Sequence, residues 1–174
     1  MKGKNAAVYM LTLLLSVAIL AGCGDSGIKK VKENADIVKE YNDAIGTYNK
    51  LALSFTSLAR LVDDEIKKGA AFDKAFWDKF TEEEKKVLTR KNAMESYTFN
   101  YREIEAVMDE IRPFIANVER YLKAASEYRE GGGDADREKF AASHRQLYND
   151  MMEQSSRIVN KFDGIYNSFV VGND

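Results

Sequence analysis

The chain has 174 residues, with 26 lysines and arginines against 28 aspartates and glutamates, one histidine, one cysteine and one proline. This length allows one domain, and a formal net charge of -2 leaves no surplus of positive charge to hold a nucleic-acid backbone. A single cysteine excludes a disulfide within the chain and a cysteine-rich zinc site, and a single histidine excludes the usual multi-histidine metal sites. The composition therefore predicts no metal, no cofactor and no nucleic-acid partner.

The first 22 residues have the pattern of a secretion signal peptide that is cleaved from the mature chain. Lys2 and Lys4 form a basic start, the stretch 6–21 is apolar, and small residues precede Cys23. The apolar stretch is shorter than the roughly 20 residues that a stable membrane span needs. Two alternatives are a buried free cysteine next to an ordinary cleaved signal, and an uncleaved anchor.

Residues 20–23, Leu-Ala-Gly-Cys, resemble the lipobox of bacterial lipoproteins. In those proteins a dedicated peptidase cuts before the cysteine once its thiol carries diacylglycerol. The resemblance implies diacylglycerol and an N-acyl lipid on Cys23, a lipidated tether over 23–33 and a location in the bacterial cell envelope. In such lipoproteins an aspartate directly after the cysteine would signal retention in the inner membrane, and here Gly24 holds that position. The resemblance therefore favours the periplasmic face of the outer membrane in a Gram-negative cell. In other bacteria it favours the outer face of the cell membrane.

Three long helices are predicted from seams of apolar residues that recur mainly at alternating spacings of three and four. The seams run from Val38 to Ile66, from Met94 to Ala125 and from Phe140 to Phe169. The second contains Pro113, and because the apolar phase is unbroken on both sides of it we expect a kinked, continuous helix. The matched lengths predict an all-α fold, an elongated antiparallel three-helix bundle within a domain that covers 34–172. The three helices cover about 34–68, 93–129 and 136–170.

The stretch of about 71–90 is predicted to form one or two short helices folded at the end of the bundle. Thr81 with Glu84 has the pattern of a capping box that starts a helix. An aromatic face either closes the bundle or serves as an interaction patch for another protein, and closure is favoured because an exposed patch of this size promotes aggregation. This face consists of Phe72, Phe76, Trp77 and Phe80.

Residues 41–51, Tyr-Asn-Asp-Ala-Ile-Gly-Thr-Tyr-Asn-Lys-Leu, resemble the tyrosine-asparagine repeat that opens the mature domain of YiiG-like bacterial lipoproteins. The stretch around Tyr121, Tyr128 and 144–147 is similar to that family's second half, where an aromatic-rich helix, a polar loop and a histidine-bearing helix follow in this order. The resemblance covers most of 33–170. It implies a helical lipoprotein domain of uncharacterised function and carries over no catalytic residue.

No group of residues in the sequence predicts catalysis. His144 falls on the apolar stripe of the third predicted helix, and no glutamate stands three residues before it, so the Glu-x-x-His pattern of di-iron bundles is missing. We expect a structural histidine and, for His144→Leu, a stability that is equal or slightly raised. The acidic clusters at 63–65, 82–84 and 109–110 are expected on solvated faces, because consecutive helical residues point in different directions.

These features favour a lipid-anchored interaction or scaffold module of the cell envelope, without catalysis. Its expected partners are the membrane, through the lipid anchor, and another envelope protein. A carrier of a small ligand or lipid is the alternative, and it requires a cavity of several hundred Å³ between the helices. An enzyme is the third candidate, which the missing histidines, thiols and motifs disfavour.

Overall fold

The computed structural model describes residues 25–69 and 72–168. Nearly all of these residues are α-helical, and no strand occurs among them, which confirms the predicted all-α fold. None of these helices is long and apolar enough to cross a membrane. The helices are α1 (Asp25–Lys68), α2 (Lys74–Glu95), α3 (Arg102–Glu105), α4 (Met108–Gly131) and α5 (Asp134–Tyr166).

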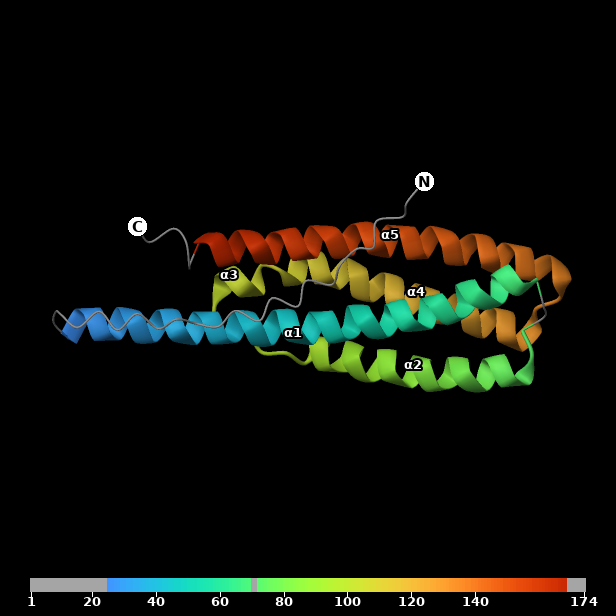
Figure 1. The fold of residues 1–174 in the computed structure, drawn as a ribbon, viewed down its shortest axis with the longest axis horizontal. Helices are drawn as coiled ribbons and strands as arrows, with labels where there is room; N and C mark the ends of the chain where they lie inside the picture. The colour runs from blue at the N-terminus through green and yellow to red at the C-terminus, as the bar shows by residue number, and fades with distance from the viewer. Residues whose placement is uncertain (1–24, 70–71, 169–174) are drawn as a thin grey trace.

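The four long helices run in alternating directions and form an elongated bundle (Figure 1). α1 packs against α2 and α5, and α4 packs against α5. Aromatic rings connect α4 to α1 and to α2: Phe55 of α1 contacts Tyr121 of α4, and Trp77 of α2 contacts Tyr128 of α4. The first turns of α1 extend beyond the ends of the other helices (Figure 1).

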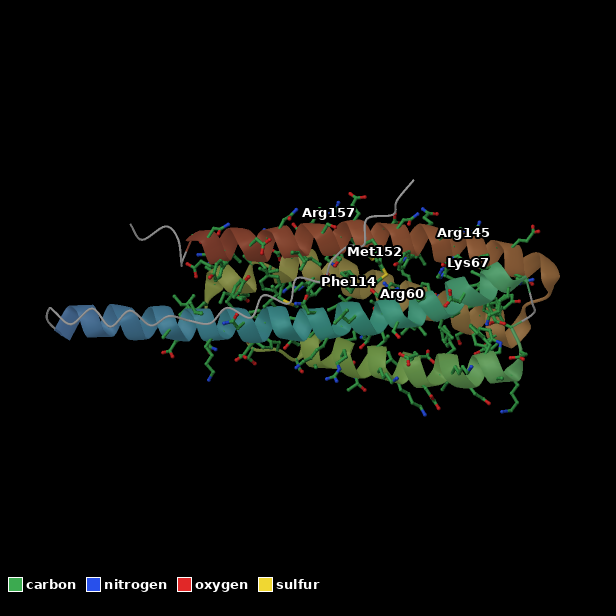
Figure 2. All side chains as sticks on the ribbon, viewed as in Figure 1. Arg60, Lys67, Phe114, Arg145, Met152 and Arg157 are labelled. Carbon is green, nitrogen blue, oxygen red and sulfur yellow. The ribbon has the colours of Figure 1, made fainter. Side chains whose placement is uncertain are left out.

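The core consists largely of the predicted seam residues. Phe114 of α4, labelled in Figure 2, lies among rings from α1, with its centroid 5.5 Å from that of Tyr48 and 6.2 Å from that of Phe55. The burial of apolar side chains is the main source of stability in a helical bundle, because each CH₂ group removed from water contributes about 0.8 kcal/mol. Almost completely buried seam residues include Leu58, Val62, Ile111, Val118, Met151, Ile158 and Phe162.

The first and third predicted long helices correspond to α1 and α5, but the prediction of one continuous helix at 93–129 is wrong, because its residues belong to three separate helices. α2 ends at Glu95, residues 96–101 are not helical, and α4 begins only at Met108. The apolar spacing continues across this break because residues on both sides of it, such as Met94 and Ile104, are buried in the same core. Pro113 lies inside α4, which continues through it as predicted.

Of the one or two short helices predicted at about 71–90, the structure has one, α2, which is longer than expected because it begins at Lys74 and continues to Glu95. Asp73 starts this helix, and its carboxylate accepts a hydrogen bond of 2.8 Å from the backbone N–H of Phe76. Thr81 does not start a helix, because its hydroxyl donates to the carbonyl oxygen of Trp77 within α2. A hydroxyl in mid-helix often binds the preceding turn in this way.

The ends of the predicted elements differ as well. α1 starts at Asp25, so it includes most of the stretch expected to be the tether at 23–33. Cys23 and the predicted signal peptide at 1–22 lie outside the described residues, as do 169–172 at the end of the predicted domain. From Asp25 onward, this stretch is therefore helical rather than an irregular linker.

Candidate functional site

The predicted aromatic face of α2 is packed against the other helices. Phe76 and Phe80 are buried, and the half-buried Phe72 ring lies with its centroid 5.5 Å from that of Tyr128 in α4 and 5.8 Å from that of Phe140 in α5. The face thus closes one end of the bundle, as expected. It does not form an exposed interaction patch in the described chain.

Two arginines cover the edge of this aromatic cluster. The guanidinium carbon of Arg129 lies 5.7 Å from the Trp77 ring centre, and that of Arg137 lies 5.8 Å from the Phe72 ring centre. Arg137 also donates a 2.9 Å hydrogen bond to the carbonyl oxygen of Gly69. These contacts could not be predicted from the sequence, because the two arginines lie about fifty to seventy positions further along the chain.

His144 is buried at the contact between α4 and α5, with 2% of its surface exposed. Its Nδ1 lies 2.8 Å from the hydroxyl oxygen of Tyr121, and its ring stacks on Tyr148 at a centroid distance of 6.2 Å. Lys67 and Arg145 mark this end of α1 and α5 in Figure 2. The predicted burial of His144 on the apolar stripe is confirmed, and its partner, Tyr121, could not be assigned to it from the sequence.

The pKa values of the pair are shifted in directions that keep both groups neutral. Burial lowers the pKa of His144, an effect that the carboxylate of Asp63 opposes and the charge of Arg145 reinforces. Burial raises the pKa of Tyr121 well above its usual range. A neutral imidazole and a protonated phenol therefore share one hydrogen bond, which links α4 to α5.

Glu40 is a buried carboxylate that the sequence analysis did not identify. Its oxygens accept hydrogen bonds of 2.9 and 3.1 Å from the backbone N–H groups of Asn100 and Tyr101, and one of 2.8 Å from the Asn100 side-chain amide. The Tyr97 hydroxyl donates to the Glu40 carbonyl oxygen at 3.3 Å. Glu40 of α1 therefore positions the loop that joins α2 to α3.

An open groove of about 660 Å³ lies next to this loop, between the end of α2, α3 and the first half of α4. The apolar side chains of Met108 and Ile115 line it. Tyr97 and Phe99 contribute two half-buried rings, whose centroids are 4.7 Å apart. The sequence analysis missed this groove because it assigned 93–129 to one continuous helix.

The charged side chains of the groove come mainly from α2 and α4. Glu95 and Glu119 both line it, and Lys91 connects them, with its Nζ 3.0 Å from a carboxylate oxygen of Glu95 and 2.8 Å from one of Glu119. The hydrogen bond to Glu119 is the main reason why the pKa of Lys91 is raised. Glu105 of α3 and Arg112 of α4 complete the charged lining.

No cluster of three or more histidine, cysteine, aspartate and glutamate side chains within 25–69 and 72–168 is arranged to hold a metal ion. The predicted acidic clusters at 63–65, 82–84 and 109–110 lie on α1, α2 and α4. Asp63 and Asp109 make ion pairs with Lys67 and Arg112 on their own helices. Pairs of this kind between exposed side chains contribute little to stability.

No protein-family model matches the sequence, and comparisons with curated proteins and with solved structures find no match. The resemblance to YiiG-like lipoproteins therefore stays a prediction from the sequence.

Proposed function

We propose that this protein is a bacterial lipoprotein whose helical bundle is a non-catalytic interaction module of the cell envelope. The observation that carries the proposal is the sequence Leu-Ala-Gly-Cys at 20–23, which follows a basic start and an apolar stretch and contains the only thiol of the chain. Diacylglycerol with a further acyl chain on Cys23 gives stable anchoring, whereas a single chain gives only marginal membrane binding.

The form of the bundle supports this proposal. α1 begins at Asp25, two positions after Cys23, and continues as one helix to Lys68. A lipid on Cys23 is then joined to the bundle by a helix rather than by a long flexible linker. An anchored bundle of this kind presents the outer faces of its helices to a neighbouring protein of the envelope.

Site-specific crosslinking in living cells tests the interaction module. A photo-crosslinking amino acid is placed at Leu53 on α1 or at Met152 on α5, whose side chains are 59% and 44% exposed. We expect at least one position to give a discrete adduct with one envelope protein, and Cys23→Ser to abolish it because the anchor is lost. If neither position gives an adduct from protein present at its normal level, the interaction module is refuted.

The groove favours a second candidate function, the carriage of a small ligand. Its volume of about 660 Å³ lies in the range of about 300 to 1,000 Å³ that is usual for ligand sites. Ala116 lines the groove and is exposed, so Ala116→Trp fills it without disturbing the core. Ala142→Trp places the same side chain on the exposed surface of α5 as a matched control.

The two functions predict opposite results for these variants in a strain that lacks the wild-type gene. A carrier loses its function with Ala116→Trp and keeps it with Ala142→Trp. An interaction module that acts through other faces functions normally with Ala116→Trp. Circular dichroism of both variants verifies that the bundle is folded.

A further inference from the structure

We propose that the groove binds a small organic cation that carries an apolar group, such as an aralkylamine. This inference rests on the second candidate function, ligand binding in the groove, and names the chemical class of its ligand. The apolar lining, the two aromatic rings and the surplus of carboxylates each select one part of such a molecule.

The apolar part of the ligand is expected to contact the inner side of the groove. Met108 and Ile115 line it there and are themselves more than nine-tenths buried, so they are held by the core. The Tyr97 ring forms a wall whose position is fixed, because its hydroxyl donates to the backbone of Glu40. A site that is rigid before binding loses less conformational entropy when the ligand enters.

Carboxylates outnumber cations around the groove. The lining residues and the two ion-pair partners of three of them together carry a formal charge of -2, the difference between four negative and two positive groups. A cationic ligand is therefore attracted, and an anionic ligand of the same shape is repelled. The six groups are Glu95, Glu105, Asp109 and Glu119, which are negative, and Lys91 and Arg112, which are positive.

Glu105 is the carboxylate most available to a ligand. Glu95 and Glu119 share Lys91, and Arg112 is paired with Asp109, whereas Glu105 has no ion-pair partner among the described residues. Its exposure leaves the carboxylate free to approach an ammonium group. The faces of Phe99 and Tyr97 provide a second attraction, since an aromatic ring binds a cation through its negative face.

Phenethylamine and 3-phenylpropionate are suitable probes, because both carry a phenyl group on a short chain and their charges are opposite. The full chain, purified in a non-ionic detergent, is labelled with ¹³C in its methionine methyl groups. Met108 lines the groove and reports binding, and Met152 on the exposed surface of α5 serves as an internal reference. We expect saturable shifts at Met108 with the amine, and an affinity at least about ten-fold lower for the carboxylate.

Two variants on α3 form a matched pair. Glu105→Gln removes the unpaired carboxylate of the groove and is expected to weaken amine binding about two- to five-fold. Glu103→Gln removes an exposed charge of the same helix that does not line the groove, and we expect the amine affinity to stay the same. Circular dichroism verifies the fold of both.

The possible results separate this inference from the function on which it rests. If 3-phenylpropionate binds at Met108 as tightly as phenethylamine or more tightly, the proposed ligand class is wrong, while ligand binding in the groove is supported. If neither probe shifts Met108 at concentrations up to the millimolar range, both are refuted. Equal effects of Glu105→Gln and Glu103→Gln would also contradict the proposed role of Glu105.

Discussion

His144 and Tyr121 form the most completely buried polar contact between two helices of the bundle. Their exposed fractions are 2% and 1%, and 2.8 Å separates the His144 Nδ1 from the Tyr121 oxygen. From the sequence alone, a leucine at 144 is expected to be neutral or stabilising, because the position belongs to an apolar stripe. The structure changes this expectation, because the substitution leaves the Tyr121 hydroxyl without its partner in a site that water does not reach.

We therefore predict that His144→Leu lowers the free energy of unfolding by about 1 to 2 kcal/mol, the cost of one buried unpaired hydroxyl. The double variant His144→Leu with Tyr121→Phe removes both partners and is expected to be about as stable as the wild type. Chemical denaturation of the single and double variants measures the coupling. If His144→Leu lowers the free energy of unfolding equally in the wild type and in the Tyr121→Phe background, the hydrogen bond has no role in stability.

The lowered pKa of His144 also predicts a pH dependence of stability. The ordinary histidine pKa is near 6.5, and the unfolded chain takes up its proton there while the folded chain does so only at lower pH. The stability that the neutral His144 contributes is therefore fully present above the pKa of the histidine in the unfolded chain. It declines as the pH falls below that pKa. Asp63 of α1 opposes the shift, but burial and Arg145 outweigh its effect.

Denaturation at a series of pH values between about 5 and 8 tests this prediction. The wild type is expected to lose more stability than His144→Leu as the pH falls from about 6.5 to 5.5. The carboxylates of the bundle are common to both proteins, so the difference between the two curves isolates the histidine. Parallel curves would contradict a lowered pKa.

Glu40 connects α1 to the loop before α3, and this connection leads to a third prediction. Glu40→Ala removes the acceptor of the Asn100 and Tyr101 backbone N–H groups and is expected to lower stability by about 1 to 3 kcal/mol. Hydrogen exchange of these two amides should become faster. The exposed neighbour Lys39 provides the control, and Lys39→Gln should leave the exchange rates unchanged.

At the scale of helices, the spacing of apolar residues located buried faces better than helix ends. The seam of α1 was predicted from Val38 to Ile66, and its members at Tyr41, Tyr48, Phe55, Ala59 and Val62 are buried. The break after Glu95 could not be predicted in this way, because Met94, Ile104 and Met108 are buried on both sides of it. The acceptor that stabilises the break, Glu40, lies about sixty positions away in the chain.

The length of α2 was missed for a related reason. Its aromatic residues cluster at one end, and the Thr81–Glu84 pattern suggested a new helix start. Val87 and Lys91 continue the buried face of α2 beyond these aromatics. The buried face of α2 is hard to recognise at Lys91, because a lysine is normally expected to be exposed. Here Lys91 is buried and lies between two glutamates at the edge of the core.

The packing of α2 onto the bundle end gives a fourth prediction. Phe76 is buried among the rings of Phe72, Trp77 and Phe80, so Phe76→Ala is expected to lower the free energy of unfolding by about 3 kcal/mol or more. Trp77 is the only tryptophan, and its half-buried ring should emit at shorter wavelength than free indole and be poorly quenched by iodide. Emission typical of an exposed indole, together with an unchanged unfolding midpoint in Phe76→Ala, would contradict the packed face.

At the scale of the whole molecule, the all-α class follows from periodicity, but the number of long helices does not. Three stripes of matched length predict a three-helix bundle, and a fourth stripe of 22 residues in α2 was counted as a connection. The groove arises where α2 ends and the chain crosses to α4. The groove could not be predicted from the sequence, because it forms at a break within the stretch 93–129 that was expected to be one continuous helix.

The proposed lipid on Cys23 determines where the bundle acts, and the proposed function of the whole molecule therefore depends on it. Cells that express the wild type or Cys23→Ser are grown with an alkyne-bearing fatty acid, and the purified chains are tested for label, length and membrane association. We predict that the wild type is labelled, shortened by the 22 residues before Cys23 and found with the membrane. We further predict that Cys23→Ser is unlabelled and largely uncut. Label on Cys23→Ser, or a wild-type chain without label, would contradict the lipoprotein account.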